Sequence, residues 1–232
     1  MPDLETLRAR IRERSPLPPA ETEDVIRKRF SSIPRRLSFA LDRWPLGTAA
    51  VLDVGSSWGH CLAQFGPGSV GVDSVQDQID FCTALGLDAR LADANRDLAE
   101  VPDESFDFAW VSDIVEHLDA PRLLLRSVRR KLKPDGHLIL VTTVLPSSGP
   151  AAALMRRTVY RGFDAEAHHY QFTLATVRFL LERAGYQVVS ASSPYPLPTS
   201  LAPRIFVDAT PDPDAERLAL EAERRNRGAF ED

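Results

Sequence analysis

The sequence lacks most features of secreted, membrane-spanning and nucleic-acid-binding proteins. Its 232 residues include only two cysteines, Cys61 and Cys82, too few for a disulfide framework, so we expect two buried free thiols. No apolar run is long enough to span a bilayer, and the charged N-terminus lacks the apolar stretch of a signal peptide. A net charge of −5 leaves no surplus of basic residues for a phosphate backbone. These absences predict a cytoplasmic protein with no membrane span and no nucleic-acid partner.

The length suits one domain with appended segments. We expect an N-terminal helical segment at residues 1–47, a central domain at 48–210 that contains an insertion at 146–172, and a C-terminal helix or tail at 211–232. Residues 21–41 carry apolar side chains at helical spacing, with a break or kink expected at Pro34.

The central region alternates short β-rich runs with helical patterns. Three runs are almost continuously apolar, which is typical of parallel strands covered on both faces: 49–54, 106–111 and 137–144. Further strands are expected at 69–73, 87–93, 187–192 and 204–208, and helices at 58–65, 75–85, 121–132 and 172–186. This order predicts a doubly wound, mainly parallel, seven-stranded α/β sheet of the Rossmann-like kind.

Ligands of such sheets bind at the carboxyl ends of the strands. The first strand ends in Asp53-Val-Gly55, where a glycine lets the backbone turn sharply and lets a ligand approach. Asp73 follows the second strand and can accept both hydroxyls of a ribose. The dinucleotide fingerprint fails, because Ser57 and His60 stand where its second and third glycines would be. A nucleoside ligand is therefore favoured over NAD, and a dehydrogenase is disfavoured.

The motifs VLDVGSSWG, GVD, ADAN, FDFAWVSDIVEHLDAP and LKPDGHLILVTT follow one another in an order that resembles class I S-adenosylmethionine-dependent methyltransferases. With HHYQFTLATVRFLLERAGY, the chain is most similar to the branch of ubiquinone-biosynthesis O-methyltransferases and natural-product tailoring enzymes. The resemblance covers about residues 48–192. It implies S-adenosylmethionine as cofactor and a small-molecule acceptor, with oxygen favoured as the methylated atom. It also implies that segments 1–47 and 146–172 form the lid and acceptor pocket.

The resemblance further implies which residues surround each part of the cofactor. They are Asp53, Gly55, Ser56, Ser57, Trp58 and Gly59 at the methionine, Asp73 and Ser74 at the ribose, Asp93 and Ala94 at the adenine, and Ser112 and Asp113 below the sulfonium. Ser57 departs from the family, which has a glycine there. A serine is tolerated at this place if its φ is negative.

A hydroxyl acceptor benefits from a general base, for which histidine is the usual choice. We favour His168 or His169 in the lid over His117, which we expect one turn into a helix and turned into the fold. No metal site is assigned. The spacing of Asp113, Glu116 and His117 would nevertheless place all three on one helical face, and it resembles an acid-x-x-Glu-His pattern that some quinone O-methyltransferases use near a divalent metal.

Two alternatives stay open at the level of sequence. One is methylation of nitrogen on an amine or amino sugar. The other is a non-catalytic, nucleoside-binding relative, which Ser57 and the bulky Trp58 suggest. No motif indicates the acceptor or the oligomeric state.

Overall fold

The computed structural model describes residues 3–145, 154, 168–199, 202–214, 217 and 221. Most of the expected insertion at 146–172 and of the expected C-terminal segment at 211–232 therefore lies outside the described residues. Within these ranges, no helix combines the length and the apolar character that crossing a membrane requires.

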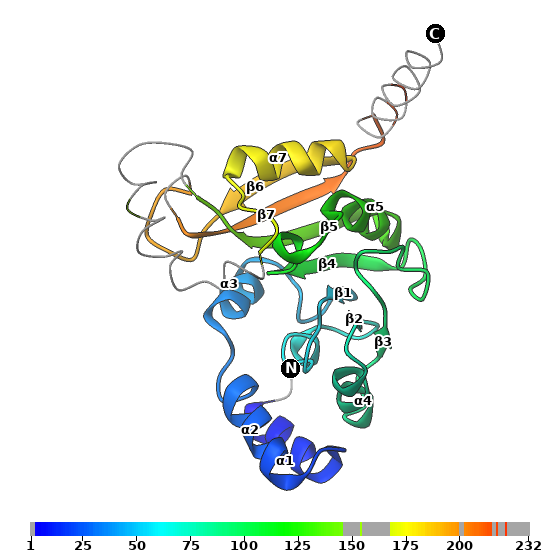
Figure 1. Ribbon diagram of the computed structural model, residues 1–232, viewed down its shortest axis with the longest axis vertical. Coiled ribbons are helices and arrows are strands. Elements are labelled where there is room, and N and C mark those ends of the chain that lie inside the picture. Colours follow the sequence, from blue (N-terminus) through cyan, green and yellow to red (C-terminus); the bar gives the residue numbers. More distant parts are fainter. Residues whose placement is uncertain are drawn as a thin grey trace.

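Seven strands form a single sheet in the order β3-β2-β1-β4-β5-β7-β6 (Figure 1). Strand β7 runs antiparallel to β5 and β6, while the pairs from β3 to β5 are parallel, so the predicted mainly parallel, doubly wound sheet is confirmed. The bounds are β1 (Val51–Val54), β2 (Val70–Asp73), β3 (Ala89–Leu91), β4 (Phe106–Ser112), β5 (Leu132–Thr143), β6 (Tyr186–Ser192) and β7 (Arg204–Pro211). The order reverses between β1 and β4, where such folds place their ligand.

Helices cover both faces of the sheet. Figure 1 shows α5 and α7 on one side and α3 and α4 on the other. The bounds are α1 (Leu4–Arg14), α2 (Pro19–Arg29), α3 (Arg35–Arg43), α4 (Gln76–Ala84), α5 (Pro121–Lys131) and α7 (Leu174–Arg183), with short 3-10 turns η1 (Leu62–Gln64) and η2 (Val115–His117). The expected break at Pro34 is confirmed, because α2 ends before it and α3 begins directly after it.

The face that α3 covers is rich in aromatic side chains. Alternation along the strands directs Trp110 of β4 and Phe206 of β7 to this side. The ring centroid of Phe206 lies 4.9 Å from that of Phe39, 6.3 Å from Trp44 and 6.2 Å from Trp110. Packing around Phe206 therefore fixes α3 against this face of the sheet.

The first two helices belong to a separate cluster. Leu7 and Ile11 of α1 pack with Ile26 of α2 and with Phe81 of α4. Phe30, just after α2, brings its ring centroid to 6.3 Å from that of Phe81. The N-terminal helices thus extend the flank formed by α4, while α3 alone reaches the sheet.

Both cysteines are buried free thiols, as expected. Burial raises the pKa of the Cys61 thiol above its ordinary value and raises the pKa of Cys82 to about 12. Both side chains therefore stay uncharged and act as small apolar groups in the core.

The helix expected at 58–65 is wrong. Only the three-residue η1 forms there. Gly59 has a φ of +74°, which ends helical geometry, and a Cβ at this position would lie 2.8 Å from the Sγ of Cys82. The chain therefore passes α4 as a tight turn, and its apolar residues pack without forming a helix.

Replacing Phe206 by Ala should lower the free energy of unfolding by about 3–5 kcal/mol, because a fully buried ring is removed from the α3 face. Phe179 on α7 is 64% exposed and offers the same substitution as a control, with an expected change within about 0.5 kcal/mol. Urea denaturation followed by circular dichroism measures both. Equal effects would contradict the packing described for α3.

Candidate active site

The turn after β1 holds an unusual backbone conformation. Gly55, Ser57 and Gly59 all have positive φ, at +76°, +50° and +74°. The φ of Ser57 is therefore not negative, as a serine at this place would require. The serine adopts a left-handed conformation that costs roughly 1–2 kcal/mol. Its N–H donates to the Oδ2 of Asp73 over 2.9 Å, which holds the turn closed against this strain. A Cβ on Gly55 would lie 2.9 Å from the Cδ1 of Ile114, so only glycine fits without a shift.

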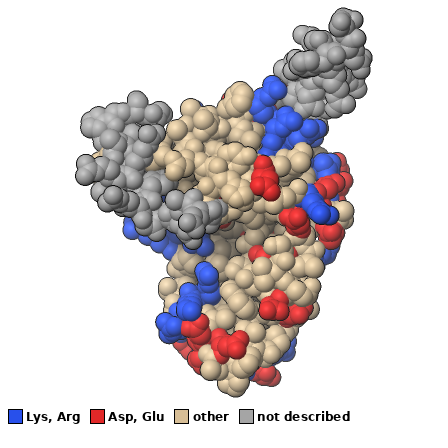
Figure 2. Space-filling view, viewed as in Figure 1, with Lys and Arg blue, Asp and Glu red and all other residues tan. Residues whose placement is uncertain are grey.

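A cavity of about 210 Å³ lies at the carboxyl ends of β1, β2 and β3. Five of the predicted cofactor residues line it together: Gly55, Asp73, Ser74, Asp93 and Ala94. The other lining residues are Val54, Val72, Ala92, Asn95, Ile114, His117 and Leu118. Figure 2 shows this face of the molecule hollowed near its middle, with acidic side chains beside the hollow.

Asp73 connects the two loops that enter this cavity. Its Oδ2 accepts from Ser57 N–H, and its Oδ1 accepts from Val75 N–H over 3.1 Å. Each carboxylate oxygen keeps a further lone pair, which a hydroxyl group of a ligand can use. The carboxylate therefore shapes the cavity and is also available to a ligand.

Asp53 is a buried carboxyl group of the site, at the end of β1. It is 2% exposed, and its Oδ2 has no hydrogen-bond partner in the part of the chain that the structure describes. Burial raises its pKa to about 7; the nearby charge of Asp73 acts in the same direction and that of Arg36 opposes it. A buried carboxyl oxygen without a partner is well suited to a cationic group of a ligand.

Arg36 of α3 belongs to the same site, and sequence reasoning missed it. Its Nη2 lies 3.4 Å from the Nε2 of His60, and its Nε lies 3.9 Å from the Oδ2 of Asp113. Burial, assisted by Arg36 and Arg29, lowers the pKa of His60 to about 4, so this imidazole is neutral. A neutral imidazole does not repel the guanidinium of Arg36. The guanidinium faces the carboxyl groups of Asp53 and Asp113.

The helical face expected for Asp113, Glu116 and His117 does not form, and His117 does not lie one turn into a helix. Asp113 has a φ of +54°, and the chain then makes only the 3-10 turn η2. The Oδ1 of Asp113 lies 3.0 Å from the Nη2 of Arg204, at the start of β7. Glu116 is 1% exposed, and burial raises its pKa. The backbone reversal separates Asp113 from the other two residues.

The structure brings His117 and His168 together, with ring centroids 4.5 Å apart. Contrary to expectation, His117 lines the cavity and is not turned away from it. Possible ligand atoms of Glu116, His117 and His168 all lie within 4.8 Å of one another, so these three residues could hold a divalent metal ion. The Nδ1 of His169 instead lies 3.1 Å from Asp119, on the outer side of the segment.

Trp58, Ser56 and Ser112 are further residues of the predicted cofactor set. The ring of Trp58 packs edge-on against Phe81, at a centroid distance of 5.2 Å, and is not part of the cavity lining. Ser56 is buried, and its hydroxyl has no hydrogen-bond partner among the described residues. Ser112 Oγ lies 3.5 Å from the Oδ2 of Asp113.

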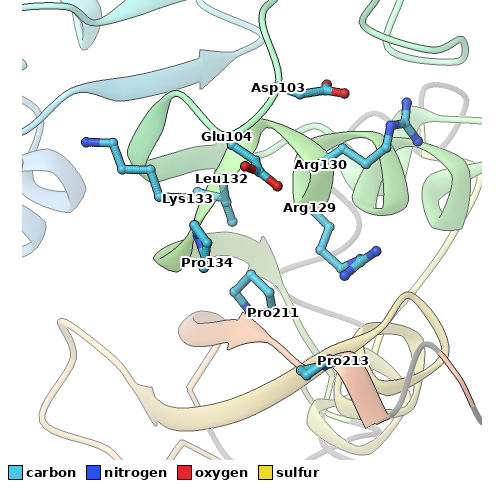
Figure 3. Close-up of a pocket in the computed structure, with 9 residues that line it drawn as sticks. All are labelled: Asp103, Glu104, Arg129, Arg130, Leu132, Lys133, Pro134, Pro211 and Pro213. Carbon is cyan, nitrogen blue, oxygen red and sulfur yellow. The ribbon is translucent and has the colours of Figure 1, made fainter.

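A cavity of about 340 Å³ opens at the opposite edge of the sheet (Figure 3). Its lining includes Arg130 and Lys133, but Arg130 pairs with Asp97, and Lys133 pairs with Asp107 over 2.5 Å. Because these charges are already paired and lie at the amino ends of the strands, this cavity is not part of the candidate active site.

Comparison with known proteins agrees with this geometry. A family model described as a methyltransferase domain matches residues 25–191. A ubiquinone biosynthesis O-methyltransferase of Xanthomonas oryzae pv. oryzae is 28% identical over 147 residues, a match that spans 60% of this chain and 62% of that protein. The chain therefore belongs to the methyltransferase domain family, and its class is that of the S-adenosylmethionine-dependent methyltransferases.

Solved structures support the fold. A methyltransferase of Thermotoga maritima, described as a "possible histamine N-methyltransferase", has a TM-score of 0.61 at 17% identity over 83% of this chain and 96% of that one. The [4+2]-cyclase SpnF has a TM-score of 0.57 at 17% identity over 77% and 80%. Because a cyclase shares the fold, likeness at this level says nothing about the acceptor.

Replacing Asp53 by Asn should remove a pH-dependent loss of stability. The pKa is about 7 in the folded protein and 3.8 in an unfolded chain, so the folded state binds more protons between these values. The free energy of unfolding of the wild type should therefore fall as pH rises through this window, by at most about 1.4 kcal/mol per unit. Urea denaturation at about pH 5 and about pH 8 should show a steeper fall for the wild type than for the variant. Parallel pH profiles would refute the assignment.

Proposed function

We propose that this protein transfers a methyl group from S-adenosylmethionine to an oxygen atom of a small-molecule acceptor. The observation that carries the proposal is the cavity at the switch point of the sheet, where Gly55, Asp73 and Asp93 meet beside the buried carboxyl of Asp53. The cofactor supplies an activated methyl group on a sulfonium. The chain itself has to hold the two reactants in line and exclude water.

Two carboxylates in the cavity wall, and two charged side chains beside the cavity, would each bind a different part of the cofactor. Asp73 would accept hydrogen bonds from the ribose hydroxyls, and Asp93 would accept one from the amino group of the adenine. At the other end, Asp53 would accept the ammonium of the methionine portion, and Arg36 would bind its carboxylate. The methionine portion is a zwitterion. Asp53 would meet its positive group and Arg36 its negative group.

His168 is the candidate general base. It contacts His117 in the cavity wall, whereas the imidazole of His169 faces Asp119. A proton taken from an acceptor hydroxyl as the methyl group moves would go to a ring nitrogen of His168. Glu116 and His117 would orient this imidazole.

Calorimetry with S-adenosylhomocysteine tests the cofactor assignment. The wild type should bind it and should give no heat with NAD. Gly55→Val should abolish binding, because the added side chain enters the cavity wall next to Ile114. Gly68→Val is the matched control: Gly68 has a φ of +81°, so the backbone strain is the same, but a Cβ there meets only Ala50 at 3.5 Å. Binding of NAD alone would refute the proposal.

Alanine variants at the two lid histidines test the base. His168→Ala should lower turnover by about 10²–10⁴-fold with unchanged affinity for S-adenosylhomocysteine, and His169→Ala should have the smaller effect. Transfer of an isotopically labelled methyl group to the hydroxyl of salicylate, followed by mass spectrometry, measures turnover. The same assay after chelation shows whether a metal ion takes part. Full activity of His168→Ala would exclude this residue as the base.

A further inference from the structure

A cluster of two arginines and one aspartate lies beside the cavity. Arg36 comes from α3, Asp113 follows β4, and Arg204 begins β7. In the sheet register Arg204 pairs with Thr143, the last residue of β5, so this antiparallel strand begins at the edge where the parallel strands end. Alternation along β7 places Arg204 on the same face as Phe206, which packs under α3.

The cluster occupies the side of the site that the cavity leaves open. The cavity lies at the ends of β1, β2 and β3 and reaches Ile114 after β4, while Asp113 directly follows β4 and Arg204 begins β7. An acceptor has to approach the methyl group from the side that the cofactor does not fill. The two arginines therefore stand where an acceptor would enter.

The positive charge of the cluster exceeds its negative charge. The carboxylate of Asp113 lies 3.0 Å from Arg204 and 3.9 Å from Arg36, and within the described ranges neither arginine is in an ion pair with another carboxylate. The Nε atoms of both arginines are buried and have no hydrogen-bond partner in those ranges. One carboxylate thus serves two guanidinium groups that keep unused donors.

We propose that Arg204 is a specificity-determining residue that binds a carboxylate of the methyl acceptor, so that the substrates are hydroxy acids. This inference rests on the proposed function and names its substrate class. The Nη2 of Arg204 lies 3.0 Å from the Oδ1 of Asp113, and the side chain of Arg204 is 23% exposed, so the guanidinium can be reached by an acceptor. A planar carboxylate matches this fork of donors. Because Arg36 is assigned to the methionine carboxylate, Arg204 is the arginine of the cluster that remains for the acceptor.

Calorimetry on the full chain saturated with S-adenosylhomocysteine tests the inference with two matched pairs of probes. Salicylate is compared with salicylamide, and lactate with lactamide, because each amide keeps the hydroxyl and the shape but lacks the charge. The wild type should bind at least one acid about 10- to 100-fold more tightly than its amide, the range expected for a charge-assisted hydrogen bond. Arg204→Gln should abolish that preference, and Arg204→Lys should keep part of it.

Arg35→Gln is the control variant. The guanidinium of Arg35 lies over the ring of Tyr195, 5.8 Å from its centroid, and donates to the carbonyl of Pro194, so the preference for acids should persist. A general loss of structure in Arg204→Gln would weaken acid and amide alike and would lower the affinity for S-adenosylhomocysteine, whereas the inference requires a change in their ratio alone.

Two results would overturn the inference: no preference for either acid in the wild type, including no binding of any probe, or a preference that survives in Arg204→Gln. The binding of S-adenosylhomocysteine is measured in the same titrations. If it is intact while the preference is absent, only the inference about Arg204 fails. If the wild type does not bind S-adenosylhomocysteine, the proposed function fails with it.

Discussion

The hydrogen bonds from the backbone N–H groups of Ser57 and Val75 to the carboxylate of Asp73 fasten the loops after β1 and β2 to each other. The turn that lines the cavity after β1 depends on this pair. With the first loop held in a left-handed turn, Gly55 passes close to Ile114, and Asp53 is sealed beneath the turn. The strained φ of Ser57 is maintained because its N–H has a charged acceptor.

The sheet could be predicted from sequence because its central strands are buried on both faces. Their almost continuous apolar runs at 49–54, 106–111 and 137–144 distinguish them from surface strands. Once the order of strands and helices is known, the loops after β1, β2 and β3 have to meet at one edge. For this reason Gly55 and Asp73 were expected at the cavity wall, and both lie there.

Long-range contacts were beyond local patterns. Arg36 and Arg204 contact Asp113 from elements far apart in the chain, and no local sequence pattern predicts such contacts. The 3-10 turn at 115–117 was missed because its spacing also fits a helix, and the positive φ of Asp113 decides between them. Helix α1 lies within the helical segment predicted at 1–47, but its bounds were not predicted although a signal existed: Asp3 caps it by accepting from the N–H of Thr6, ahead of apolar residues at helical spacing.

The charges of the site are divided between its two sides, and this division follows from burial. On the cavity side, burial raises the pKa of Asp53 to about 7. A cationic group of the ligand would stabilise the ionised form of this carboxyl. On the other side, two arginines share one carboxylate, and Arg204, the arginine that the cofactor would not use, favours an anionic acceptor. A cationic methyl donor and an anionic acceptor would each be attracted to its own side, and each would neutralise charge that the folded chain leaves unpaired. Electrostatics would thus align the reactants before any proton is transferred.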